Sequence, residues 1–235
     1  MTAKGKLWGL GCGPGDPDLI TLKALKLLQA ADVVAYPAPL EGESFARSIA
    51  APHLTGDQTE YPIRIPMVAD RGPAQDVYYQ AAKDLATYLN EGSTVAVLCE
   101  GDPFFYGSFM YLFQRLVEDH DVGVVPGVSS VMACAAEAGM PLGERTDVIT
   151  IIPASISENE LKNKLRDTDT AVIMKVGRHL SKVRSILETL RLTDNAFYVE
   201  RATLPDQRII PLVEISDDAA PYFSMILVQK SGVKL

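Results

Sequence analysis

A short acidic and aromatic stretch is the first candidate for chemistry in this chain. The apolar run 95–98 ends, after one cysteine, at the turn Glu-Gly-Asp-Pro (100–103), and three consecutive aromatic residues follow at 104–106. An uninterrupted apolar run is typical of a strand buried on both faces of a parallel sheet. Open α/β sheets bind ligands at the carboxyl ends of such strands. The stretch 95–109 therefore predicts a ligand-binding loop, although an ordinary strand-to-helix turn with core aromatics has the same composition.

Two other loops combine small residues that allow a backbone to approach a ligand. Gly-Cys-Gly-Pro-Gly-Asp-Pro (11–17) has three alternating glycines, which permit sharp turns and close contacts. Pro-Gly-Val-Ser-Ser (126–130) follows a short strand expected at 121–125. Each loop comes directly after a predicted strand, so the three are expected at the carboxyl edge of one sheet.

Two common nucleotide fingerprints are absent from these loops. A dinucleotide-binding G-x-G-x-x-G beginning at residue 11 or 9 requires a third glycine where the chain has Asp16 or Pro14. No G-x-x-x-x-G-K-[ST] phosphate loop occurs, and the second predicted strand ends Ala-Tyr-Pro (35–37), without a carboxylate to hold a ribose. The loops are therefore not a standard pyrophosphate site.

The elements that position these loops alternate in the first part of the chain. Strands are expected at 6–11, 32–36, 61–67, 95–98 and 121–125, and helices after Thr21, at 43–51, 73–90 and 108–118, and after Ser130. Thr21 is the expected N-cap of the first helix, with Leu22, Leu25 and Leu28 on one face. Pro37 is expected to end the second strand, and the two prolines of 61–67 restrict it to an edge. This order predicts a parallel sheet with helices on both faces.

After Gly-Met-Pro (139–141) the pattern starts again. Strands are expected at 148–152, 171–175, 196–199, 208–213 and 222–228, with helices at 158–165 and 180–190. The last two strands have no helix between them, which indicates antiparallel pairing and a mixed sheet. We therefore predict an α/β fold of two domains in series, residues 1–125 with a parallel sheet and residues 126–235 with a mixed sheet.

Composition excludes several classes of function. Of the 235 residues, 47% are hydrophobic and 22% charged, as in ordinary globular proteins, and no apolar run approaches the length of a membrane helix. A net charge of −8 without a Lys/Arg cluster argues against nucleic acid as the main partner. Three cysteines and three histidines are scattered, so we expect no disulfide, no metal site and a reducing cytoplasm. No signal-peptide core is expected at the amino terminus.

The three loop motifs together, in this order, resemble those of the tetrapyrrole methylase family. The matching stretches are Gly-Leu-Gly-Cys-Gly-Pro-Gly-Asp-Pro (9–17) with Leu-Ile-Thr-Leu-Lys-Ala (19–24), Glu-Gly-Asp-Pro-Phe-Phe-Tyr-Gly (100–107) and Pro-Gly-Val-Ser-Ser (126–130). The resemblance covers nearly the whole chain. It implies a methyltransferase dependent on S-adenosylmethionine (SAM), with the cofactor in the cleft between two α/β domains.

Within this family the chain is most similar to the C20 methyltransferases of corrin biosynthesis. Ile-Pro-Met (65–67), the stretch 100–112 and Ile-Met-Lys-Val-Gly-Arg (173–178) carry that similarity. It implies a tetrapyrrole substrate, either precorrin-2 or its cobalt counterpart, and a homodimer. Uroporphyrinogen methyltransferases of the family typically have Tyr-Asp where this chain has Tyr36-Pro37. The difference disfavours that substrate and leaves no general base implied by the resemblance.

The family pattern also implies which residues contact the cofactor. They are Pro14, Gly101, Asp102, Phe105, Ser129, Ser130, Met174 and Ala202. Ser129 and Ser130 lie at the start of a helix, where free N–H groups suit a carboxylate. Met174 and Ala202 correspond to positions that enclose adenosine.

Methyl transfer from a sulfonium to an electron-rich substrate carbon needs alignment rather than an activated side chain. We therefore interpret Cys12 as a small loop residue. Asp102 and Tyr106 are candidates to assist proton removal, without a firm assignment. A substrate rich in carboxylates calls for arginines, and the candidates are Arg47, Arg64, Arg178 and Arg201.

Three alternatives remain open at this point. A precorrin-3B or precorrin-4 methylase would keep the fold and cofactor but methylate another carbon. A diphthine synthase-like enzyme would modify a protein, and it usually lacks the Gly-Pro-Gly-Asp-Pro loop. A tetrapyrrole carrier without activity would not bind SAM.

Overall fold

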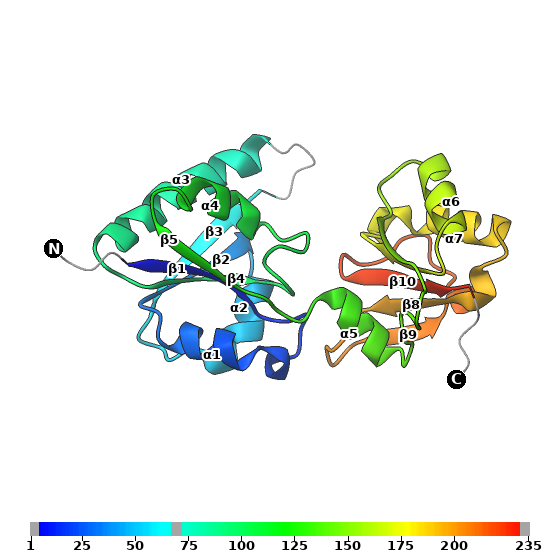
Figure 1. Ribbon diagram of the computed structural model, residues 1–235, viewed down its shortest axis with the longest axis horizontal. Coiled ribbons are helices and arrows are strands. Elements are labelled where there is room, and N and C mark those ends of the chain that lie inside the picture. The colour runs from blue at the N-terminus through cyan, green and yellow to red at the C-terminus, as the bar shows by residue number, and fades with distance from the viewer. Residues whose placement is uncertain (1–4, 67–71, 231–235) are drawn as a thin grey trace. The chain divides into compact units, whose positions relative to one another are not determined.

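Two sheets of five strands each organise the chain, which the computed structural model describes over residues 5–66 and 72–230 (Figure 1). The chain divides into two units, residues 1–129 and 130–235, and each sheet lies within one of them. The prediction of two α/β domains in series, one with a parallel and one with a mixed sheet, is confirmed.

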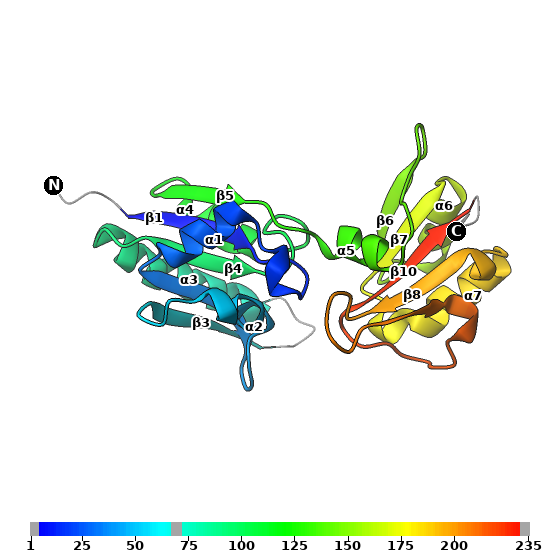
Figure 2. The same cartoon turned by 90° about the horizontal axis from the view of Figure 1, so that it is seen from below.

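The first sheet is entirely parallel. Its strands are β1 (Lys6–Gly11), β2 (Val33–Pro39), β3 (Thr59–Ile65), β4 (Val95–Cys99) and β5 (Asp121–Val125). Their order across the sheet is β3-β2-β4-β1-β5, and in the turned view β5, β1 and β4 follow one another across the unit (Figure 2). Every residue of β4 is buried, as its uninterrupted apolar sequence predicts.

Helices cover both faces of this sheet (Figure 1). They are α1 (Leu22–Gln29), α2 (Phe45–Ala50), α3 (Gly72–Asn90) and α4 (Phe109–Leu116). Leu98 of β4 packs in the cluster formed with α1 and α2, whereas Val97 packs in the cluster formed with α3 and α4. Successive residues of a strand point to opposite faces, so β4 contributes to two cores at once.

Helix α1 begins at the predicted residue, but the face that it buries differs from the apolar face seen in the sequence. The Thr21 side chain caps it by accepting a hydrogen bond from the Ala24 N–H. The face predicted to carry Leu22, Leu25 and Leu28 is not the buried one throughout, because Leu22 is 75% exposed and the buried residues are Ala24 and Leu28. A spacing of four residues places Ala24 and Leu28 on one side of the helix, and Leu22 lies outside that stripe.

Two prolines lie inside β2, which corrects the prediction that Pro37 ends this strand. The strand continues to Pro39 and pairs with β3 along its whole length, while its pairing with β4 covers only 33–35. Beyond Ala35 one edge of β2 has no partner strand, so the missing N–H groups of the prolines cost no ladder bond. Strand β3 is an edge strand, as its own prolines predict.

The second sheet is mixed. Its strands are β6 (Ile149–Pro153), β7 (Thr170–Met174), β8 (Ala196–Glu200), β9 (Arg208–Pro211) and β10 (Ser224–Gln229), and the helices of this unit are α5 (Ser130–Glu137), α6 (Glu158–Arg166) and α7 (Leu180–Thr189). The order across the sheet is β6-β7-β10-β8-β9. Strands β6 and β7 are parallel, and β10 runs antiparallel to both of its neighbours. The predicted mixed sheet is confirmed, but the prediction that β9 and β10 pair antiparallel with each other is wrong, because each pairs antiparallel with β8.

The core of the second unit lies under α6 and α7. Leu161 and Leu165 of α6 and Ile186 of α7 pack with inward residues of the sheet, among them Ile173 and Ile226. Ser157 and Glu160 form a capping box at the start of α6, which fixes where that helix begins.

Three loop glycines touch at the carboxyl edge of the first sheet. A Cβ on Gly127 would lie 2.1 Å from the Gly101 carbonyl oxygen and 2.8 Å from the Gly11 Cα atom. A Cβ on Gly11 would lie 2.5 Å from the Gly127 Cα atom. The loops after β1, β4 and β5 are therefore in direct backbone contact, which no other residue type permits at these positions.

Gly127→Ala should lower the free energy of unfolding by about 1–3 kcal/mol, because the loops must separate to admit the methyl group. Urea unfolding measures the change. Gly56→Ala in the same unit is the matched control, since its Cβ would meet nothing within 4 Å and only the positive φ of +89° adds strain. A loss for Gly127→Ala no larger than that for Gly56→Ala would contradict the close packing of the loops.

An ion pair and a tyrosine hold the Glu60 carboxylate on β3. Arg47 Nε donates to Glu60 Oε2 at 2.6 Å and Arg47 Nη2 donates to Oε1 at 2.7 Å. The Tyr36 hydroxyl donates to Oε2 at 2.7 Å. These hydrogen bonds, chiefly from Arg47, lower the pKa of Glu60 to about 2. The cluster fastens α2 to the β2–β3 edge of the sheet.

Glu60→Gln should lower the free energy of unfolding by about 1 kcal/mol near pH 7, a value discounted for the partial exposure of the pair. Because the pKa of Glu60 is lower in the folded state, its carboxylate stabilises the fold at pH values above the ordinary pKa of 4.5. This stabilisation is lost as the pH falls toward about 2. The difference between wild type and variant should therefore shrink in urea unfolding near pH 3. Exposed Glu41→Gln is the control, and an equal difference at both pH values would contradict the assignment.

Candidate functional site

The adjacent strands β1 and β4 are the topological switch point of the first sheet. The connection after β1 leads to α1 on one face, and the connection after β4 leads to α4 on the other (Figure 1). Connections that diverge from neighbouring parallel strands open a crevice at their carboxyl ends, where ligands of such folds bind. The loops 11–17 and 100–108 border this place, as expected from their position after strands.

Backbone hydrogen bonds join these two loops. The Cys12 N–H donates to the Cys99 carbonyl at 2.9 Å, and the Gly101 N–H donates to the Gly13 carbonyl at 2.8 Å. The Gly13 N–H donates in return to the Gly101 carbonyl at 3.4 Å. The Gly101 N–H is thus already bonded within the protein, while half-buried Pro14 follows directly after the bridge.

The Asp102 carboxylate binds the protein's own backbone. Its Oδ1 accepts hydrogen bonds from the N–H groups of Phe104 and Phe105 at 2.9 and 3.1 Å. Its Oδ2 accepts one from the Gly127 N–H at 3.0 Å. One side chain therefore closes the turn after β4 and fastens it to the loop after β5.

Phe105 and Tyr106 form the aromatic part of the loop. Their rings meet edge to face with centroids 5.1 Å apart, and Tyr106 has a positive φ of 55°. A tyrosine in this conformation is uncommon and persists only where surrounding contacts hold it. Phe105 is half-buried and Tyr106 is exposed. Phe104 packs on Phe109 and Phe113 of α4, so part of the aromatic run serves packing, as the ordinary interpretation of the stretch requires.

Ser129 and Ser130 lie where β5 has ended and α5 begins. Ser130 is the first residue of α5, and both serines are half-buried. The first N–H groups of a helix have no partner within the helix and favour a negative group. The expected position of these two residues at a helix start is observed.

In the second unit, Met174 and Ala202 lie at one edge of the sheet. Met174 ends β7 and pairs with Met225 at the start of β10, and Ala202 follows the end of β8, whose Glu200 pairs with Ser224. Ala202 is buried and Met174 is half-buried. Positive φ angles occur beside both of them, at Lys175 (58°), Arg201 (50°) and Thr203 (70°). Strained backbone concentrated at the ends of two strands supports a functional role for this edge.

The four candidate arginines differ in what they contact. Arg47 is bound to Glu60, Arg64 donates to the Pro39 and Gly42 carbonyls, and Arg201 pairs with Glu200 and Asp206. Arg178, exposed in the short turn Gly177–His179 after β7, has no hydrogen bond or ion pair within the described part of the chain. Arg178 is therefore the most available of the four for an anionic ligand.

Cys12 is unsuited to nucleophilic chemistry. Its side chain is buried, its thiol donates to the Leu10 carbonyl at 3.6 Å, and burial raises its pKa to about 12. In residues 5–66 and 72–230 no group of three or more His, Cys, Asp or Glu side chains is placed to hold a metal ion. Within the same residues no helix is both long and apolar enough to cross a membrane.

Glu100 is a residue whose surroundings the sequence did not reveal. Burial raises the pKa of its carboxyl group, and it has no hydrogen bond or ion pair within the described residues. The signal available in the sequence was an acid placed directly between a fully apolar strand and a glycine. Near it, the Tyr78 hydroxyl on α3 is also buried without a hydrogen-bond partner among the described residues, and burial raises the pKa of Tyr78 to about 12.

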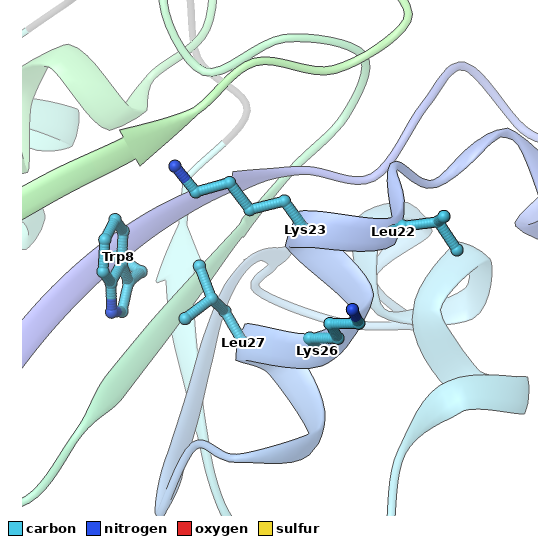
Figure 3. A pocket seen from close by; sticks show the side chains of 5 residues that line it. All are labelled: Trp8, Leu22, Lys23, Lys26 and Leu27. Atoms are coloured by element: carbon cyan, nitrogen blue, oxygen red, sulfur yellow. The ribbon is translucent and has the colours of Figure 1, made fainter.

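An open pocket of about 560 Å³ lies beside α1, away from the strand ends (Figure 3). It is lined by Trp8 of β1 and by Leu22, Lys23, Lys26 and Leu27 of α1. The ammonium groups of Lys6 and Lys23 lie 4.4 and 5.8 Å from the centre of the indole ring. The lining contains no carboxylate and none of the loop residues 11–17, 100–107 or 126–130, so the pocket is not a candidate for the chemistry.

Relatives with known names match almost all of the chain. A Sinorhizobium sp. protein named precorrin-2 C(20)-methyltransferase is 42% identical over 95% of each chain, and a Salmonella typhimurium protein named cobalt-precorrin-2 C(20)-methyltransferase is 35% identical over 96% of this chain and 97% of its own. The Mycobacterium bovis cobalamin biosynthesis protein CobIJ is 40% identical over 97% of this chain, but this chain spans only 46% of its length.

Solved structures show the same architecture. The structure of a cobalt precorrin-4 methyltransferase, CbiF, superposes with a TM-score of 0.75 at 26% identity, covering 95% of this chain and 94% of that one. A uroporphyrin-III C-methyltransferase of Thermus thermophilus, complexed with S-adenosyl homocysteine, has a TM-score of 0.69 at 21% identity over 96% of this chain and 98% of its own.

The family model described as Tetrapyrrole (Corrin/Porphyrin) Methylases matches residues 6–215, which include the three loop motifs and most of the second sheet. This match agrees with the switch-point loops, with the pair of α/β units and with the relatives that align end to end. The chain belongs to the tetrapyrrole methylases.

Proposed function

We propose that the protein is a SAM-dependent methyltransferase that adds a methyl group to C20 of precorrin-2 in cobalamin biosynthesis. The observation that carries the proposal is the 42% identity, over 95% of both chains, to a relative named for this reaction. The cobalt-containing counterpart of precorrin-2 is the second candidate substrate, because a relative named for it aligns over 96% of the chain at 35% identity.

The cofactor assignment draws support from the loops at the switch point. Gly11, Gly101 and Gly127 bring three backbones into contact, and the Asp102 carboxylate fixes the turn that presents Phe105. A rigid wall of this kind suits a ligand that must be held in one orientation. We assign Pro14, Gly101, Asp102 and Phe105 to this wall.

The remaining cofactor contacts belong to other elements. Ser129 and Ser130 lie at the start of α5, and the positive end of a helix dipole suits the carboxylate of the methionyl part. We assign Met174 and Ala202, at the strained edge of the second sheet, to the adenosyl part. Apolar contacts from these two side chains would hold an aromatic base without competing for its hydrogen bonds.

The reaction places few demands on side-chain chemistry. When bound, SAM supplies a methyl group on a good leaving group, and the nucleophile is a carbon of the substrate. The protein therefore contributes mainly by alignment, which is worth several kcal/mol, roughly 7–11 in the best-oriented cases. Arg178 is the arginine assigned to substrate carboxylates, since the other three candidates are bound within the protein.

We further infer that the protein acts as a homodimer, as the family resemblance implies, and that it acts in the cytoplasm, which its few scattered cysteines favour. Sedimentation velocity of the purified protein measures its oligomeric state, and a monomer at micromolar concentration would contradict the inference.

Asp102→Ala should weaken SAM binding at least about tenfold, or about 1.4 kcal/mol. The substitution removes three hydrogen bonds that fix the turn, so the wall of the cofactor site becomes mobile. Titration calorimetry with SAM measures the change in Kd. Asp119→Ala, an exposed change beyond α4, is the control for folding and charge. Undiminished binding by a folded Asp102→Ala protein would remove this loop from the cofactor site.

Incubation with precorrin-2 and SAM labelled in its methyl group should place the label at C20 of the product. NMR of the isolated tetrapyrrole locates it, and a parallel reaction with the cobalt-containing substrate decides between the two candidates. Label at another carbon would indicate a precorrin-3B or precorrin-4 type of methylase. Binding of the tetrapyrrole without binding of SAM would indicate a carrier instead.

A further inference from the structure

Glu100 is a half-buried acid at the edge where the candidate site lies. It follows the fully buried strand β4 and precedes Gly101, whose backbone is bonded in both directions to Gly13. This pairing fixes the position of the Glu100 backbone relative to the loop after β1. No hydrogen bond or ion pair of its carboxylate is found within residues 5–66 and 72–230.

The groups around Glu100 supply no positive charge. Cys12, Cys99 and Tyr78 interact with it electrostatically, and burial raises the pKa of each of them. All three are therefore neutral near pH 7. Glu100 is half-buried, and a partly desolvated carboxylate without a cation or a hydrogen-bond donor is costly to keep. Such groups in native proteins call for an explanation. A functional role is the usual explanation when the group lies beside a ligand site.

The other acids and phenols of the loop are less suited to accept a proton. Asp102 is engaged by three backbone N–H groups, which hold both of its oxygens in place. Tyr106 is half exposed to water, and its ring packs edge to face against Phe105. Glu100 is thus the acid of the loop whose oxygens have no structural task.

We propose that Glu100 is the general base that takes the proton from the substrate carbon after methylation. The inference rests on the proposed function, in which that carbon is C20. In the reaction the electron pair of the substrate carbon forms the new bond to the methyl carbon, and the electron pair of the broken carbon–sulfur bond stays on sulfur. The methylated carbon still carries its hydrogen. The proton passes to a Glu100 oxygen, and the electron pair of the C–H bond returns to the conjugated system.

The surroundings of Glu100 favour this role in two ways. Burial raises its pKa, which makes it a stronger proton acceptor than an exposed glutamate. Taking up the proton also removes an uncompensated charge from a poorly hydrated place, so the product state of the base is the one that its environment prefers. Release of the proton to water completes the cycle.

Glu100→Gln should lower kcat for methylation of precorrin-2 on the order of a hundredfold or more, the usual contribution of a general base. KM for SAM should stay within about twofold of wild type, since the amide keeps the shape of the side chain. Glu100→Asp, which keeps the carboxylate at a shorter reach, should recover part of the rate. Exposed Glu118→Gln on the same unit is the matched control.

The pH profile separates a base from a structural residue. Wild-type kcat should rise with pH through the raised pKa of Glu100 and then level off, and Glu100→Asp should retain such a rise. The Glu100→Gln variant should show no such rise of kcat with pH. A merely structural role would instead change KM and stability and leave the pH profile intact.

Thermal unfolding gives an independent measurement. Because the pKa of Glu100 is raised in the folded state, its charge destabilises the fold as pH rises from the ordinary glutamate pKa of 4.5 through the raised value. Glu100→Gln should therefore unfold at the same temperature as wild type, or at a higher one, above that range. A large loss of stability would identify Glu100 as structural and overturn the assignment.

The outcomes are distinguishable from a failure of the proposed function. If wild type transfers the methyl group and folded Glu100→Gln does so at an equal rate with an unchanged pH profile, the assignment of Glu100 is wrong and the function stands. If wild type transfers no methyl group to either tetrapyrrole, the function and the assignment fall together.

Discussion

The contact of three glycine backbones at the carboxyl edge of the first sheet is the constraint on which the candidate site depends. Strands β4, β1 and β5 are neighbours, so their loops leave the sheet within a few ångströms of one another. Without side chains at Gly11 and Gly127, the loops meet directly, and the Gly101 carbonyl occupies space that a Cβ would fill. The Asp102 carboxylate then bonds across the junction to the Gly127 N–H. The glycines allow the loops to pack closely, and the Asp102 carboxylate holds two of these loops together.

The sequence predicted those parts of the fold that depend on local pattern. Strands β1 and β5 have the predicted bounds, 6–11 and 121–125, because each is a short segment with clear turn residues on both sides. The cap at Thr21 was predicted for the same reason, since a hydroxyl ahead of a helical pattern needs only the next few residues to act. The parallel order followed from strands alternating with helices.

What the sequence could not predict depends on partners far along the chain. Whether Pro37 ends β2 is decided by where β4 stops pairing with it, at Ala35. The face of α1 that is buried is decided by how the helix rests on the sheet, which leaves Leu22 in solvent. The Asp102 side chain bonds to a backbone group 25 positions away. Motif similarity could name Asp102 as a cofactor contact, but only the folded chain reveals that its oxygens are already bonded to the backbone.

The two acids of the Glu-Gly-Asp-Pro turn illustrate how environment assigns different tasks to similar groups. Asp102 has three N–H donors, which satisfy its charge and tie it to the scaffold. Glu100, two residues earlier, is half-buried and has no hydrogen-bond donor among the described residues, and its neighbours Cys12, Cys99 and Tyr78 are neutral. Both oxygens of Asp102 are thus committed to holding the loop. A carboxylate left unpaired gains from protonation. One acid of the turn thus holds the loop and the other is left to accept a proton, and Gly101 between them is paired with Gly13.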